Sequence, residues 1–153
     1  MTARPGQLTA VHDAAIVIDG LVISDWSRPT LEAMVAGGIT AANCTCAVWE
    51  GFDETLANIR AWHARIAAND DLLMPVTEAV HIHEAKAAGK VGIILGFQNT
   101  APVGDDLANV RRFHDLGVRV MQLTYNNRNL SGCGCMVGDD TGLTDFGRSL
   151  IDA

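Results

Sequence analysis

The chain has 153 residues and a formal net charge of −7, with 48% hydrophobic and 19% charged residues. This apolar content excludes an intrinsically disordered chain. The acidic balance argues against a nucleic-acid partner, because proteins that bind a phosphate backbone normally display a basic face. No apolar run approaches the ~18–20 residues that a membrane-spanning helix needs, and residues 1–12 lack the apolar core of a secretory signal. We therefore expect one globular domain over residues 1–153, no membrane partner, and a cytoplasmic location with reduced cysteines.

The first part of the chain alternates short apolar runs with helical patterns. Residues 15–18, closed by Asp19-Gly20, are typical of a buried strand, and residues 21–23 are a candidate continuation. Ser27 as N-cap and Pro29 in the first turn predict a helix that stops at Gly37-Gly38.

The same alternation continues to the end of the chain. The next predicted elements are a buried strand over 39–49, an amphipathic helix from Asp53, a short extended piece over 72–76 and a helix capped by Thr77 that ends at Gly89. They are followed by a strand over 91–95, a helix over 107–116, a strand over 118–124, a loop over 125–142 and a helix from Leu143.

A helix stop, a glycine and a buried strand follow one another three times, at Gly38, Gly89 and Gly117. Such connections build parallel sheets covered by helices. Four clear strands are too few to close an eight-stranded barrel, which typically takes about 250 residues. We therefore expect the first half of a larger (β/α) barrel, or a small open α/β domain as the alternative. A half barrel exposes strand edges, so we also expect a homo-oligomer.

Polar side chains follow two of the predicted strands. Gln98 and Asn99 come after residues 91–95, and the run Tyr-Asn-Asn-Arg-Asn at 125–129 follows residues 118–124. Function collects at the carboxyl ends of parallel strands. Amides with a phenol and a guanidinium suit the recognition of carboxylates or amides, whereas asparagine also simply favours turns. Both interpretations stay open from the sequence.

The residues that resemble metal-binding motifs have simpler explanations. His81 and His83 lie on a predicted helix, where residues two apart point in opposite directions, so we expect a solvated helix face. Cys44 and Cys46 share one face of a predicted strand, and Cys133 and Cys135 lie in a loop. Structural zinc sites usually pair cysteines as C-x(2–4)-C, so ordinary core cysteines are favoured over a four-cysteine site or a redox pair.

Four segments have a distinctive order and spacing: VIDG at 17–20, GIILGFQN at 92–99, LGVR at 116–119 leading to QLTYN at 122–126, and GLTDFGR at 142–148. Together they resemble the membrane (renal-type) dipeptidases, a family of metallopeptidases, and in particular its bacterial dipeptidase-like branch. The resemblance implies a (β/α)8 TIM barrel of the metal-dependent hydrolase type, of which this chain is the N-terminal half. It also implies hydrolysis of dipeptides at a two-zinc centre.

The same resemblance predicts that this chain lacks the family's metal ligands. The family places a His-x-Asp pair after the Asp-Gly of its first strand, and those positions here are Leu21 and Ile23. The family's bridging glutamate corresponds to Gln98, whose neutral amide does not supply the negative oxygens of a two-zinc site. The family's substrate-facing histidine corresponds to Tyr125. We therefore expect no metal ligand in this chain, and zinc is implied only for the family.

Two main functional hypotheses follow. The first is a dipeptidase-like hydrolase of a small peptide-like or amide substrate. Its catalytic residues would be Gln98, Tyr125 and Cys135, and its substrate-binding residues would be Asn99, Asn126, Arg128 and Asn129. The second is a metal-free pseudoenzyme, or a barrel that binds a small polar ligand over an apolar floor formed by Leu21 and Ile23.

Overall fold

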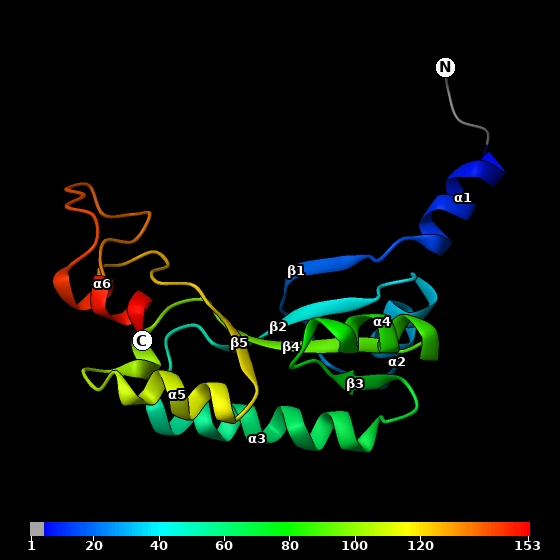
Figure 1. The fold of residues 1–153 in the computed structure, drawn as a ribbon, viewed down its shortest axis with the longest axis horizontal. Helices are drawn as coiled ribbons and strands as arrows, with labels where there is room; N and C mark the ends of the chain where they lie inside the picture. The colour runs from blue at the N-terminus through cyan, green and yellow to red at the C-terminus, as the bar shows by residue number, and fades with distance from the viewer. Residues whose placement is uncertain (1–4) are drawn as a thin grey trace.

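A computed structural model of the chain describes residues 5–153, which form six α-helices, one 3-10 helix and five strands (Figure 1). In chain order the elements are α1 (Pro5–Ala14), β1 (Ile18–Val22), α2 (Arg28–Ala36), β2 (Ala41–Ala47), α3 (Phe52–Ala68), β3 (Leu73–Pro75), α4 (Ala79–Ala88), β4 (Val91–Phe97), η1 (Ala101–Val103), α5 (Ala108–Asp115), β5 (Val118–Met121) and α6 (Asp145–Asp152). Within residues 5–153, none of the helices has the length and apolar character needed to cross a bilayer.

The five strands form one parallel sheet with β4 at its centre. One edge of β4 pairs with β2 along its length, and β2 pairs in turn with β1. The other edge is shared: β3 pairs with residues 91–93, and β5 pairs with residues 95–97. The predicted parallel α/β arrangement is confirmed, and the extended piece over 72–76 is a true strand.

The hydrophobic core lies between one face of the sheet and the helices α2, α3 and α5. Figure 1 shows α3 and α5 running along this face. Cys44 and Cys46 of β2 point into this core, where Trp62 of α3 is almost fully buried. Phe113 of α5 is also fully buried, and its ring lies 4.9 Å from the ring of Phe97 at the end of β4. Because side chains alternate along a strand, Asn43 and Thr45 belong to the opposite face of β2.

Several local predictions are confirmed. Ser27 is the N-cap of α2 with Pro29 in its first turn, and the helix ends before Gly37. The helix predicted from Asp53 begins at Phe52 and buries the expected apolar face. The helix α1 was not predicted, because residues 5–14 carry no clear helical repeat of apolar side chains.

Three local predictions are wrong. The first strand was expected to be buried, but Ile18 and Leu21 are 49% and 47% exposed, because β1 is an edge strand paired only with β2. The N-cap of α4 is Glu78 rather than Thr77. His81 completes this capping box and is half-buried, so its ring is not simply solvated as expected.

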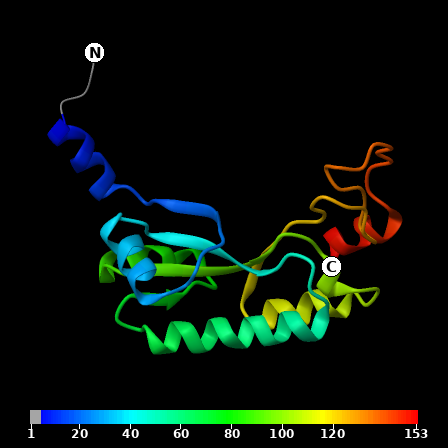
Figure 2. The same cartoon turned by 180° about the vertical axis from the view of Figure 1, so that it is seen from behind.

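The carboxyl ends of the strands face the long loop over residues 122–144 (Figure 2). This loop and α6 lie at one end of the molecule, and α1 lies at the other end in both views. The arrangement places the segments that follow β2, β4 and β5 side by side. These segments contain most of the site residues that the sequence predicted.

Candidate functional site

Gln98 follows the central strand β4 and is only 3% exposed. Its side-chain Nε2 donates a hydrogen bond to Thr45 Oγ1 at 3.1 Å, and its backbone N–H donates to Ala47 O at 2.9 Å. No group among residues 5–153 bonds to the remaining side-chain atom, Oε1. Gln98 is therefore held in one orientation, with a carbonyl oxygen left to accept a hydrogen bond.

Asn43 lies two residues before Thr45 on the same face of β2 and is 8% exposed. Its Nδ2 donates to Gly20 O at 2.9 Å, which fixes the direction of the amide. Its Oδ1 is buried without a hydrogen-bond partner among the described residues. This oxygen lies against Gly96, where an added Cβ would be only 2.2 Å from it. Only glycine leaves room for the Asn43 side chain at this point of the sheet.

The side chains of Asn99 and Asn129 are used to fasten the backbone. Asn99 donates to Val48 O, and its Oδ1 accepts from the Ala101 N–H at 2.5 Å. Asn129 Nδ2 donates to Leu123 O at 2.8 Å, and its Oδ1 accepts from the Ser131 N–H at 2.8 Å. Asn99 therefore joins the segment after β4 to the segment after β2. Asn129 braces the loop after β5 on itself and also reaches Thr100 Oγ1, after β4, at 3.4 Å.

A buried pair of hydroxyls joins the segment after β4 to the loop after β5. Thr100 Oγ1 lies 2.7 Å from Ser131 Oγ, and both residues are almost fully buried. Thr100 Oγ1 also donates to Leu123 O at 2.9 Å. The long loop is thus anchored next to the end of β4, and its position relative to Gln98 is fixed.

Trp49 and Tyr125 form an aromatic pair beside this junction. Their ring centroids are 5.5 Å apart, with an angle of 44° between the ring planes. Trp49 is 54% exposed and Tyr125 is half-buried. Neither the Tyr125 hydroxyl nor the Trp49 indole N–H has a hydrogen-bond partner among residues 5–153. The pair offers an apolar surface with two free polar groups.

Glu50 follows Trp49 and turns its carboxylate onto the backbone. Glu50 Oε2 accepts from the N–H groups of Val48 at 2.6 Å and Trp49 at 2.9 Å. Partial burial by itself raises the pKa of Glu50, but these backbone N–H groups favour the carboxylate and the net pKa lies below its usual value. Glu50 is therefore charged at neutral pH, and its carboxylate is bound to backbone N–H groups.

The remaining predicted residues lie in the loop itself. Arg128 is exposed and donates to Thr141 Oγ1 at 3.0 Å and Asp139 O at 2.9 Å. The exposed thiol of Cys135 donates to Asn126 Oδ1 at 3.3 Å, which leaves the Asn126 Nδ2 group free within the described part of the chain. These three side chains are close to solvent, in contrast to Gln98.

A protein metal site needs several donor side chains held close together. Among residues 5–153, no three His, Cys, Asp or Glu side chains come together as a ligand group. Leu21 and Ile23 are 47% and 66% exposed and have no donor atoms in their side chains.

The four cysteines are free and lie in two separate places. Cys44 and Cys46 are core residues, as favoured from the sequence. Burial raises the pKa of both thiols to about 12, and for Cys44 the neighbouring Cys46 adds to the effect. Because the thiolate is the form that binds metal and attacks carbon, these two residues are inert at neutral pH.

Sequence reasoning missed three residues of this cluster: Asn43, Thr45 and Trp49. Trp49 was placed at a strand end but given no role, and the strand over 39–49 was treated only as core. The alternation of polar residues 43 and 45 with cysteines 44 and 46 was the available signal.

Parallel β/α units with polar side chains gathered at the carboxyl ends of the strands define part of a TIM-barrel protein. A family model described as membrane dipeptidase (peptidase family M19) matches residues 24–153. The chain therefore belongs to the membrane dipeptidase family.

Solved structures of several proteins are similar to the chain. An amidohydrolase from Pseudomonas aeruginosa is 46% identical over 94% of this chain, with a TM-score of 0.91. The probable dipeptidase PvdM from the same organism is 14% identical over 96% of the chain, with a TM-score of 0.81. A metallo peptidase from Rhodobacter sphaeroides, liganded with a phosphinate mimic of the dipeptide L-Ala-D-Ala, is 17% identical over 90% of the chain, with a TM-score of 0.74.

The chain spans 44%, 46% and 55% of the lengths of these three proteins. The predicted family and the predicted fold, part of a dipeptidase-type (β/α) barrel, are both confirmed.

Proposed function

We propose that this protein hydrolyses an amide bond in a small peptide-like substrate, and that this chain supplies an uncharged hydrogen-bonding wall of the substrate site. The observation that carries the proposal is Gln98, which is fixed by Thr45 at the end of the central strand with its Oε1 free. Membership of a dipeptidase family and a 46% identical amidohydrolase support the reaction class.

The proposed roles follow from which atoms are free. Gln98 Oε1 accepts a hydrogen bond from a substrate N–H, and the Tyr125 hydroxyl donates to a substrate oxygen. Asn126 supplies a further donor through Nδ2. Asn99 and Asn129 serve the same site as positioning residues, since their amide groups already bond to the backbone.

Two residues of the loop complete this assignment. Arg128 offers a positive charge to a substrate carboxylate at the exposed end of the site. The backbone N–H of Cys135 donates to Tyr125 O at 2.8 Å, which places this residue, with its exposed thiol, next to Tyr125. It is the candidate nucleophile of this half of the protein.

The residues of this chain do not fit the two-zinc centre that the family implies. Leu21 and Ile23 have no ligand atoms, and Gln98 is a neutral amide already engaged by Thr45. A bridging position between two zinc ions requires a negatively charged oxygen ligand. We therefore propose that this chain contributes hydrogen bonds to the substrate rather than first-half metal ligands.

The test uses the full-length natural gene product, whose intact mass is measured first. L-Ala-D-Ala is the first probe, and its hydrolysis is followed by chromatography of the free amino acids with and without added zinc. We expect turnover, fewer than two zinc ions per chain, and a loss of about tenfold in kcat/KM for Gln98→Leu, equivalent to about 1.4 kcal/mol. Gln98→Asn, which keeps an amide, is the matched variant.

Binding without turnover, over a panel of dipeptides with and without zinc, would overturn the hydrolase proposal. It would favour the second candidate, a metal-free protein that binds a small polar ligand. The observation behind that candidate is Glu50, which follows Trp49 in the sequence and whose carboxylate is committed to backbone N–H groups. Thermal stabilisation by a dipeptide that persists in EDTA is the result expected for such a binding protein.

We further propose a cytoplasmic location and a homo-oligomer. Four free cysteines support a reducing compartment. The exposed apolar side chains of β1 support contact with another surface.

A further inference from the structure

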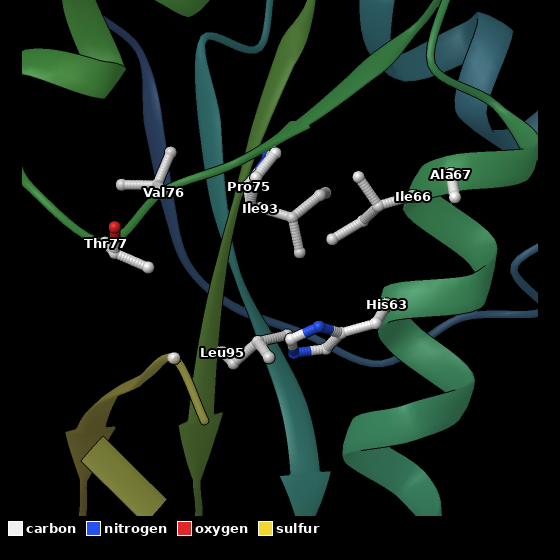
Figure 3. Close-up of a pocket in the computed structure, with 9 residues that line it drawn as sticks. His63, Ile66, Ala67, Pro75, Val76, Thr77, Ile93 and Leu95 are labelled. Atoms are coloured by element: carbon white, nitrogen blue, oxygen red, sulfur yellow. The ribbon is translucent and has the colours of Figure 1, made fainter. Parts of the chain in front are cut away.

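A cavity of about 180 Å³ lies on the helix side of the sheet, away from Gln98 and the strand ends. It opens beside β4 at the point where the partner strand changes from β3, which pairs up to residue 93, to β5, which pairs from residue 95. Figure 3 shows the lining side chains between α3 and the sheet. The lining includes His63, Ile66 and Ala67 of α3 together with Val76, Ile93, Leu95 and Gly117.

The cavity is apolar and has the volume of a single aromatic ring. Val76, Ile93 and Leu95 are 5%, 1% and 4% exposed, so its floor belongs to the buried part of the protein. An enclosed apolar cavity of about 150 Å³ accepts a benzene-sized molecule, and this cavity is of similar size but opens to solvent beside the exposed residues His63 and Ala67. No carboxylate, ammonium or guanidinium group lines this one, so a charged ligand would lose its hydration without a partner.

His63 gives the cavity one directional polar group. Its Nε2 lies 3.0 Å from Leu116 O, and because a carbonyl only accepts, Nε2 carries the hydrogen. Nδ1 is then an acceptor, and it has no hydrogen-bond partner among residues 5–153. In Figure 3 the imidazole ring lies at the edge of the space between α3 and β4. A ligand that fills the cavity can therefore donate one hydrogen bond to this ring.

We infer that this cavity binds a small neutral aromatic molecule that carries one hydrogen-bond donor, a phenol in its simplest form. The aromatic ring packs against Ile66, Ile93 and Leu95, and the hydroxyl donates to His63 Nδ1. This site is independent of the proposed amide hydrolysis, because it shares no residue with the cluster around Gln98 and Tyr125.

The test is a titration of the full-length ¹⁵N-labelled protein with phenol, and with toluene as the matched probe that lacks the donor. We expect shifts of the backbone amides of Ala67, Ile93 and Gly117, with those of Gln98 and Tyr125 unchanged. Phenol should bind about fivefold more tightly than toluene, which is the contribution of about one hydrogen bond.

Two variants separate the cavity from other surfaces. Ala67→Leu fills the cavity and should abolish the shifts, whereas Ala64→Leu, on an exposed position of α3 outside the cavity, should leave them unchanged. His63→Phe should remove the preference for phenol over toluene. The inference is overturned if neither probe shifts the lining amides, if binding persists in Ala67→Leu, or if His63→Phe keeps the preference. Circular dichroism checks that each variant is folded. If Ala67→Leu does not fold, the His63→Phe variant alone tests the inference.

Discussion

The side-chain amide of Gln98 donates to the Thr45 hydroxyl at 3.1 Å and joins the ends of β4 and β2. The two residues are 53 positions apart in the sequence. The bond uses one N–H of the Gln98 amide and fixes the direction in which Oε1 points, so it decides how the amide is presented to a substrate.

Thr45→Val should release Gln98 and lower the free energy of unfolding by about 1 kcal/mol, because a half-buried hydrogen bond is lost. Thr45→Ser keeps the hydroxyl and should lie close to the wild type. Urea unfolding of both variants measures the effect. Equal stability of the valine and serine variants would show that the bond contributes nothing.

Gly96→Ala should destabilise the protein by about 1–3 kcal/mol, because the new Cβ would lie 2.2 Å from Asn43 Oδ1. Gly20→Ala is the matched control, since a Cβ at that position meets nothing within 4 Å. Thermal unfolding of the two variants should differ clearly. A Gly96→Ala protein as stable as Gly20→Ala would contradict the packing of Asn43 against Gly96.

Glu50→Gln should make the free energy of unfolding depend less on pH in the acidic range. The pKa of Glu50 in the folded protein lies below its ordinary value of 4.5, so its stabilising effect is present at neutral pH and is lost as the pH falls below that range. Urea unfolding between pH 7 and pH 3 should show a shallower decline for Glu50→Gln. Glu84→Gln, on an exposed position of α4, should follow the wild-type curve.

The four thiols should react in two classes. Cys135 is exposed and should react rapidly with a disulfide reagent at pH 8, whereas Cys44 and Cys46 should react only on unfolding. Burial raises the pKa of these two thiols to about 12, so they stay protonated in the folded protein. In the unfolded chain the same thiols ionise at their ordinary pKa of about 9. The free energy of unfolding should therefore fall as the pH rises from about 9 towards 12. Rapid labelling of all four thiols in the native protein would contradict this assignment.

Ile18→Lys should reduce self-association. Ile18 is 49% exposed on the edge strand β1, and a charge at a strand edge opposes pairing with another chain. Light scattering after gel filtration measures the mass at several concentrations, with Asp13→Lys as a control at an exposed position outside the strand. A wild-type protein that is monomeric at all concentrations would contradict the expected homo-oligomer.

The sequence alone predicted the order of the strands and α-helices from β1 onward and their parallel α/β arrangement, and the family resemblance implied half of a barrel. Local signals set these features: the apolar face of α3, the proline that opens α2, and the glycines that end helices before buried strands. The same signals placed Gln98 and Tyr125 at strand ends, because a strand that stops at a polar run identifies its own carboxyl end.

Only the tertiary structure decided which of those polar groups are free. Asn99 and Asn129 look alike in sequence to Asn126, but the Asn99 amide bonds to the backbone of Val48, 51 positions away, and the Asn129 amide bonds to Leu123 O and reaches Thr100 Oγ1, 29 positions away. The exposure of β1 likewise depends on which strands pair with it. Hydrogen-bond partners and burial depend on residues brought together from far along the chain, so no local pattern could specify them.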